Sequence, residues 1–232
     1  MTRAAIFIDG GFLLSRLGAV QPSVDRRDVE AVGKVIDRLV ESHLKTLHRH
    51  YEAKSHWQLL YRVFYYDARP FSQKALLPVS RRPIDFAKSD QAKFREALFE
   101  RLRRTPNVAV RLGETLSERG WAPKPDALKA LLAGRRQWAD LTDDDFDPGI
   151  RQKAVDMRFG LDIASVALKR QAEIMILVTG DSDFVPAAKL ARREGVKVIL
   201  DPLWQSVRPD LFEHIDQLRS GLDRPKSAEA QP

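Results

Sequence analysis

The sequence predicts an α/β fold with a mainly parallel central sheet. Towards the C-terminus it alternates a strand at 174–179, a helix at 184–194 that stops at a glycine, and a strand at 196–200. This rhythm is typical of a parallel sheet with right-handed crossovers. Residues 4–8 alternate too little for a half-exposed strand and are typical of a buried parallel one. We therefore expect both ends of the chain to contribute strands to one sheet.

The remaining elements follow from hydrophobic spacing and from capping residues. Helices are expected where apolar residues recur every three or four positions, and strands where aliphatic and aromatic residues run together. In chain order these elements are a helix at 28–50, a strand at 59–66, a helix from Ser89 or Asp90 to about Arg104, a strand at 107–112 and a helix at 157–170.

The chain is expected to form one domain over residues 1–220, with an insertion or flap at 117–149. That stretch mixes glycines, prolines, two tryptophans and an acidic run, which leaves only short amphipathic pieces. A chain of 232 residues is long enough for one large α/β domain. The tail at 221–232 is too polar to pack and is predicted to be disordered.

Composition excludes several kinds of site. The chain has no cysteine, so disulfides, thiolate zinc sites and cysteine nucleophiles are excluded, and any metal must be held by oxygen or histidine. There is no apolar run near the ~20 residues that span a bilayer. We therefore expect a cytoplasmic protein with no membrane partner. The formal net charge of +7 suits a polyanionic partner, although an arginine-rich surface alone would also explain it.

Acidic residues stand where the first and the late strand end. Asp9 follows the strand at 4–8, and Asp181 and Asp183 follow the strand at 174–179. A single acid in such a place is explained by a turn or a helix cap, but one cap needs only one acid. If the two strands are parallel neighbours, their carboxylates meet at the edge where open α/β proteins bind ligands. Such a cluster suits hard cations and phosphate chemistry.

A third acidic segment opens the predicted helix at 157–170. Asp156 is a natural helix cap, whereas Asp162 lies among apolar residues and must face a cleft or a partner. Six helical steps rotate by about 240°, so the two side chains do not share a helix face. We expect one of them to bind a metal directly and the other to support it.

Together, three motifs resemble the NYN domain of the LabA-like group, in the PIN-like nuclease superfamily. They occur in the family's order, and the similarity runs from about Ala4 to Leu200. The motifs are Phe7-Ile8-Asp9-Gly10-Gly11-Phe12, Lys153-x-Val155-Asp156 followed by Asp162, and Gly180-Asp181-Ser182-Asp183-Phe184-x-Pro186.

The resemblance implies a three-layer α/β/α sandwich, PIN-like and Rossmann-like, and a ribonuclease that uses Mg²⁺ or Mn²⁺ to cleave RNA. It assigns catalysis and metal binding to the same four carboxylates, with Asp162 in support. These four are Asp9, Asp156, Asp181 and Asp183. Lys153 would contact a substrate phosphate, and the expected substrate-binding set is completed by Gly10, Gly11 and Ser182. The oligomeric state stays open, with a homodimer as one option.

Two other functions were weighed against the ribonuclease. A non-catalytic RNA-binding or adaptor module with the same fold is disfavoured, because clustered carboxylates repel RNA unless a cation lies between them. A phosphatase of the haloacid-dehalogenase type also has an aspartate after the first strand. Its chemistry needs a second aspartate two residues later, where this chain has Gly11.

Two apparent metal motifs are also set aside. A calcium loop that starts at Asp143 would need glycine at 148 and glutamate at 154, but Pro148 and Ala154 stand there, so the acidic run is read as a solvated turn. Four histidines on or just after the helix at 28–50 lack a consistent ligand spacing and are expected at the surface. They are His43, His48, His50 and His56.

Overall fold

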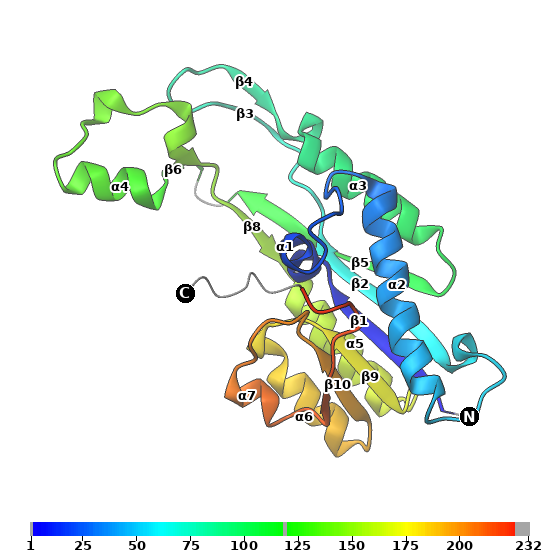
Figure 1. The fold of residues 1–232 in the computed structure, drawn as a ribbon. Coiled ribbons are helices and arrows are strands. Elements are labelled where there is room, and N and C mark those ends of the chain that lie inside the picture. Colours follow the sequence, from blue (N-terminus) through cyan, green and yellow to red (C-terminus); the bar gives the residue numbers. More distant parts are fainter. Residues whose placement is uncertain (1, 118–119, 226–232) are drawn as a thin grey trace, which may run out of the picture. The chain divides into compact units, whose positions relative to one another are not determined.

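The structure is a computed structural model that describes residues 2–117 and 120–225 (Figure 1). Two compact units are present. The first unit comprises Met1–Asp67, Ala97–Leu112 and Ala154–Pro232, and the second comprises Ala68–Glu96 and Gly113–Lys153. The predicted insertion at 117–149 falls in the second unit, which also includes an earlier stretch of the chain.

The predicted mainly parallel sheet is confirmed. Its strand order among the described residues is β11-β10-β9-β1-β2-β5-β8. β1 is parallel to both β2 and β9, and β10 is parallel to β9 and β11, whereas β8 is antiparallel to β5. The strands are β1 (Ala4–Asp9), β2 (Leu60–Ala68), β5 (Val108–Ser117), β8 (Ile150–Lys153), β9 (Ile174–Val178), β10 (Lys197–Asp201) and β11 (Gln217–Leu218).

Helices flank this sheet, as the predicted α/β/α class requires (Figure 1). The helix after β1 is not among the predicted elements, because Gly10 and Gly11 lower helix propensity and read as a turn. The helices are α1 (Gly10–Val20), α2 (Val29–His48), α3 (Asp90–Arg103), α5 (Val155–Leu168), α6 (Val185–Arg193) and α7 (Pro209–Phe212), with the short 3₁₀ turns η1 (His56–Leu59) and η5 (Ser182–Phe184).

The core lies around β1, where residues 4–8 are all buried, as predicted for a central parallel strand. Phe7 stacks on Phe64 of β2 with a centroid separation of 5.0 Å and contacts Phe159 of α5 at 5.9 Å. Aromatic packing therefore joins β1, β2 and α5, three of the elements that carry acidic residues towards one edge of the sheet.

The second unit is built from short elements. β3 (Lys74–Leu76) pairs with β4 (Pro83–Asp85), and β6 (Ala122–Pro123) pairs with β7 (Phe146–Asp147). The remaining elements are α4 (Pro125–Leu132) and the 3₁₀ turns η2 (Phe86–Lys88), η3 (Trp138–Asp140) and η4 (Asp143–Asp145).

The acidic run at 143–149 is not the solvated turn expected from the sequence. Asp143 accepts hydrogen bonds from the backbone N–H groups of Val79 and Ser80, at 2.9 and 3.0 Å. Asp145 pairs with the guanidinium of Arg136 at 2.7 Å. The pKa of Asp143 is lowered by a hydrogen bond from the Ser80 side chain and then by these backbone N–H groups, and the pKa of Asp145 is lowered mainly by Arg136. The run therefore ties loops of the second unit together.

Packing continues past residue 220. Leu222 is buried, and Trp204 Nε1 donates a hydrogen bond to its carbonyl at 2.9 Å. Leu222 is therefore packed, although it lies in the stretch predicted to be disordered, and the rest of that stretch, at 226–232, lies outside the described residues. Among the helices described, none combines the length and the apolar character needed to cross a membrane.

Candidate functional site

Three neighbouring parallel strands end together at one edge of the sheet. The register pairs Asp9 of β1 with Tyr66 of β2, so Asp67 follows one residue beyond that pair. Ile8 is paired with Val178 of β9, and Asp181 follows three residues later. The predicted meeting of acidic strand ends is therefore present, at the position where open α/β sheets bind ligands.

Asp9 and Asp181 both cap helices with one oxygen. Asp9 Oδ1 accepts a hydrogen bond from Phe12 N at 2.9 Å at the start of α1, and Asp181 Oδ1 accepts one from Asp183 N at 2.9 Å at the start of η5. In the part of the chain that the structure describes, neither Oδ2 accepts a hydrogen bond. Capping thus leaves one oxygen of each carboxylate for another partner. Asp181, not Asp183, is the cap.

The pKa of Asp9 is raised from 3.8 to about 6. Burial is the largest cause, and the charges of Asp156, Asp67 and Asp181 add to it, while the Phe12 N–H opposes. The pKa of Asp156 is raised as well, by burial and then by Asp181 and Asp183. We call the five carboxylates that these repulsions connect the acidic cluster: Asp9, Asp67, Asp156, Asp181 and Asp183.

Asp156 reaches the cluster from the first turn of α5. The N-cap of that helix is Ala154, with a left-handed φ of 63°, so Asp156 is not the cap expected from the sequence. Val155 is buried beside it, whereas Asp156 is only partly buried and keeps contact with solvent. The carboxylate is therefore held at the start of α5 without being used by the helix itself.

Asp162 makes different contacts. Its Oδ2 accepts hydrogen bonds from Tyr66 OH at 2.9 Å and from Arg111 Nε at 3.2 Å. Asp162 is not among the charges that shift the pKa of Asp9 or of Asp156. Burial and the neighbouring Asp162 raise the pKa of Tyr66. Asp162 therefore anchors the side chain of Tyr66, the residue that precedes Asp67.

Asp67 is a member of the cluster that the sequence analysis did not single out. It is 1% exposed and follows the buried aromatic run of β2. Its signal is the one used for Asp9: an apolar strand that ends at an aspartate. The signal was missed because Asp67 is followed by an Ala-Arg-Pro exit rather than by glycine.

The residues predicted to bind substrate differ in how much room the fold leaves beside them. A Cβ on Gly10 would lie 2.5 Å from the ring of Tyr65, so core packing requires this glycine, whereas one on Gly11 would have room at 3.4 Å from Asp9 Oδ1. Ser182 is half-buried in η5. Lys153 ends β8 in the second unit, where it is paired in register with Glu114.

His43 is buried, which corrects the expected surface position. It is 0% exposed, and its Nε2 lies 2.8 Å from Oδ2 of the equally buried Asp201. His48 and His50 are exposed, as expected, and His56 is half-buried. The sequence could not reveal this pair because 158 positions separate its two members.

The cluster suits a hard cation in chemistry but is not a ready-made metal site. Within residues 2–117 and 120–225, no three histidine, aspartate or glutamate side chains are placed to hold one ion together. The donors are nevertheless all carboxylates, which Mg²⁺ and Mn²⁺ prefer. The influences that raise the pKa of Asp9 include three anions and no cationic side chain. A bound cation would relieve this repulsion.

Comparison with known proteins identifies the family. The model of the NYN domain matches residues 3–207, a stretch that contains every member of the acidic cluster. No curated protein and no solved structure matches the chain. The NYN domain belongs to the PIN-like nuclease superfamily. Since the match covers most of the sequence, this chain belongs to the NYN domain family.

Proposed function

We propose that the protein is a ribonuclease that hydrolyses RNA phosphodiester bonds with Mg²⁺ or Mn²⁺. The observation that carries the proposal is the mutual repulsion at Asp9, whose pKa of about 6 results from burial beside three other carboxylates. Burying a carboxylate beside like charges costs free energy of folding, and such perturbed groups are concentrated at functional sites. Membership of a nuclease superfamily supports RNA as the substrate, and the three motifs support the LabA-like group within that family.

The residues proposed to hold metal are the carboxylates of the acidic cluster. Asp9 and Asp181 would each contribute the oxygen left over from capping, with Asp156 and Asp183 as further ligands and Asp67 as an addition from the structure. A bound divalent ion lowers the pKa of water and neutralises charge on the leaving oxygen. The protein itself supplies the fixed placement, because the caps hold both aspartates against their helices.

Other residues have positioning roles in this proposal. Asp162 orients Tyr66, and through the strand it orients Asp67. Lys153 is proposed to contact a substrate phosphate, together with the backbone around Gly11 and with Ser182. Gly10 is proposed to contact substrate through its backbone, and it also has a packing role, because Tyr65 occupies the space that a side chain would need.

A cleavage assay with purified protein and a fluorescent single-stranded RNA tests the proposal. We expect cleavage with Mn²⁺ or Mg²⁺, none in EDTA, and products that carry a 5′-phosphate and a 3′-hydroxyl. Products with a 2′,3′-cyclic phosphate formed in EDTA would overturn the metal mechanism. Tight binding without cleavage under every metal condition would instead identify a non-catalytic adaptor.

A further inference from the structure

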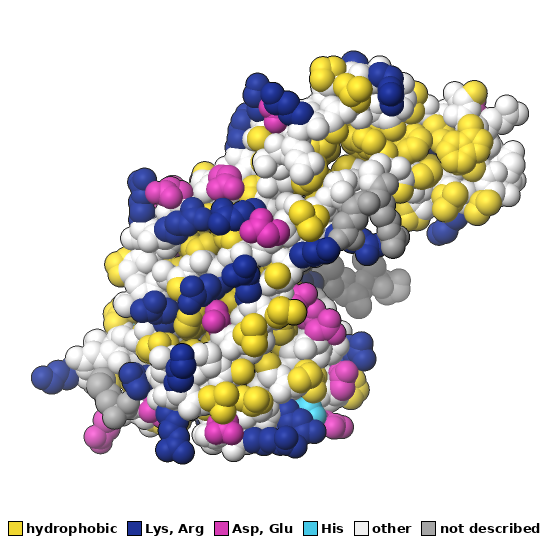
Figure 2. Space-filling view, turned by 180° about the vertical axis from the view of Figure 1, so that it is seen from behind, with side chains coloured by type: hydrophobic (Ala, Val, Ile, Leu, Met, Phe, Trp, Pro, Cys, Tyr) yellow, Lys and Arg dark blue, Asp and Glu magenta, His cyan; other side chains and the backbone are white. Residues whose placement is uncertain are grey.

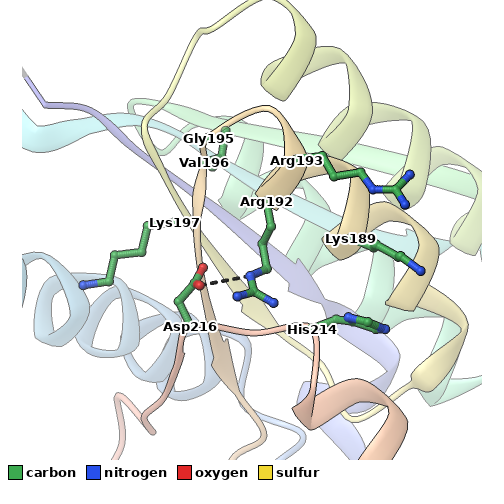
Figure 3. Close-up of a pocket in the computed structure, with 8 residues that line it drawn as sticks. All are labelled: Lys189, Arg192, Arg193, Gly195, Val196, Lys197, His214 and Asp216. Carbon is green, nitrogen blue, oxygen red and sulfur yellow. Dashed lines mark hydrogen bonds and ion pairs between the residues drawn. The ribbon is translucent and has the colours of Figure 1, made fainter.

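A groove of about 640 Å³ lies in the first unit, at the turn between α6 and β10 (Figure 3). We call it the basic groove, because four cationic side chains and only one acidic side chain line it. In Figure 3 Arg192 lies in the middle and is directed at Asp216. Lys197 lies on one side of this pair, and the other side holds Lys189, Arg193 and His214. The charged and titratable members are Lys189, Arg192, Arg193, Lys197, His214 and Asp216.

The backbone brings these side chains together. α6 ends at Arg193, the chain reverses at Gly195 with a φ of +83°, and β10 begins at Lys197. A left-handed residue at that point favours glycine, which explains the abrupt stop of the helix. This short turn therefore places the cations at the end of α6 close to Lys197, the first residue of β10.

The single carboxylate of the groove is already engaged. Asp216 Oδ1 pairs with Arg192 Nε at 2.9 Å, and its Oδ2 accepts a hydrogen bond from Val198 N at 2.8 Å. Arg192 also donates to the Glu213 carbonyl at 3.1 Å. Arg192 and Asp216 thus form a fixed floor, in which each oxygen of Asp216 already accepts a hydrogen bond and its charge is paired with Arg192.

Three cations of the groove have no acidic partner. Lys189, Arg193 and Lys197 form no ion pair with any described residue, and the neighbouring Glu194 is exposed and does not line the groove. Figure 2 shows Lys and Arg side chains spread over one face, some of them beside acidic side chains and others not. Unpaired cations around a hollow favour a polyanion, because its charge replaces the missing carboxylates.

A second cationic hollow on α2 provides a comparison. It is lined by Arg38, Lys45 and Arg49, with Glu41 among them. Lys45 pairs with Glu41 at 2.9 Å, and Arg38 donates to the Gln21 side chain at 3.4 Å. The α2 hollow therefore has the same number of removable cations as the basic groove, but it is partly neutralised by its own residues.

The basic groove lies at the opposite end of the strands from the acidic cluster. Lys197 is the first residue of β10, and β10 is parallel to β9, whose carboxyl end leads to Asp181. Five residues of strand span about 16 Å, at about 3.3 Å per residue. At about 3.4 Å per nucleotide, this corresponds to roughly five nucleotides of a stacked strand. One phosphate cannot contact both places.

We propose that the basic groove binds backbone phosphates of the RNA at a distance from the cleavage site and so anchors the chain. The identity of the anion rests on the proposed function, whereas the anion site itself rests on the unpaired cations. Each phosphate that the groove neutralises should contribute about 0.7 to the slope of log affinity against log salt for a single strand. Three engaged cations would contribute about 2.

The test compares two triple variants in an Asp9→Asn background, which prevents cleavage. Lys189→Gln/Arg193→Gln/Lys197→Gln removes the three unpaired cations of the groove and keeps Arg192, and Arg38→Gln/Lys45→Gln/Arg49→Gln removes the same charge from α2. Fluorescence anisotropy measures the binding of a single-stranded RNA of about 20 nucleotides over a series of KCl concentrations. We expect the groove variant to reduce the salt slope by about 2 and the affinity by at least about tenfold.

The α2 variant is the control that separates a specific phosphate site in the groove from a general effect of net charge. Equal losses in the two triple variants would overturn the proposal, because they would reflect net charge alone. Circular dichroism checks that each variant is folded.

Two further outcomes separate the groove from the proposed catalysis and from a small-anion site. If the wild type cleaves no RNA but the groove variant alone loses salt-dependent binding, the ribonuclease proposal fails and the groove stands. Inorganic phosphate is titrated by calorimetry into both triple variants and their parent. If the groove variant loses phosphate binding but keeps its RNA affinity, the groove is a small-anion site and our proposal is overturned.

Discussion

Asp9 and Asp201 stand in similar places and have opposite surroundings. Each is the last residue of a parallel strand of the same sheet, β1 for Asp9 and β10 for Asp201. Asp201 is 0% exposed and accepts hydrogen bonds from His43, Leu203 N and Gly221 N, each at 2.8 Å. Asp9 accepts one such bond, from Phe12 N, and is surrounded by three carboxylates. A strand-end aspartate is structural where donors surround it and a candidate ligand where acids do.

The donors around Asp201 extend into a buried chain of contacts. Arg219 Nη2 lies 2.7 Å from His43 Nδ1, and arginine can only donate, so Nδ1 accepts. The proton of the neutral imidazole is then on Nε2, which donates to Asp201. Burial lowers the pKa of Arg219, and the charge of Asp201 opposes this effect. The network connects α2, β10 and the segment after β11.

The comparison is tested most strongly by Asp9→Asn and Asp181→Asn. We expect each to reduce the rate of metal-dependent RNA cleavage by at least about a thousandfold, because each removes one of the charged ligands proposed for the metal. The fold should persist, since asparagine still accepts the capping hydrogen bond. Rates are measured with saturating Mn²⁺. Asp144→Asn, an exposed acid outside the cluster, is the control and should keep the wild-type rate.

Asp201→Ala should have the reverse effect, with lost stability and retained chemistry. The substitution leaves His43 Nε2 and two backbone N–H groups without their acceptor in the core. Breaking a buried charged network in this way costs about 3–5 kcal/mol of the free energy of unfolding. Urea denaturation measures the loss. A change below about 1 kcal/mol would show that Asp201 is not the structural counterpart of Asp9.

The pKa of Asp9 predicts a pH dependence of stability. Because its pKa rises from 3.8 to about 6 on folding, the carboxyl group favours the folded state when protonated, and this contribution is lost as pH rises through about 6. The shift corresponds to about 3 kcal/mol. Relative to the wild type in EDTA, Asp9→Asn should therefore gain stability between about pH 4 and pH 7. A difference in unfolding free energy that is constant with pH would contradict this.

The smallest effect is expected at Asp162, and Asp156 on the same helix is its matched partner. Asp162→Asn should reduce cleavage by about tenfold or less, because the residue supports Tyr66 and lies outside the charges that act on Asp9. Asp156→Asn should approach the loss expected for Asp9→Asn. Single-turnover rates compare the two. A larger loss at Asp162 would make it the direct ligand and Asp156 the support.

Strands were predicted more reliably than the contacts at their ends. β1, β9 and β10 begin and end within about two residues of the predicted ranges, because continuous apolar runs are typical of buried parallel strands. α1 was missed, since the two glycines that start it resemble a turn. The second unit could not be delimited from the sequence, because one part of it, Ala68–Glu96, has ordinary strand and helix patterns.

In the candidate site, too, local features were predictable from the sequence and long-range contacts were not. The motifs at Asp9, Asp156 and Asp181 identified the family and the sheet edge, because strand ends and helix starts are local features. The roles of Asp67, Asp162 and His43 depended on neighbours far away in the chain. Asp162 contacts Tyr66, which lies 96 positions away, and no spacing rule reports such a contact.

The sequence by itself determined the α/β class, the family and the acidic residues that end its strands. Only the tertiary structure decided which of these identical side chains repel one another and which are neutralised by donors. The physical reason is that a carboxylate's pKa and its hydrogen bonds depend on burial and on nearby charges. At Asp9 and Asp201 those neighbours come from segments that meet only after the sheet has formed.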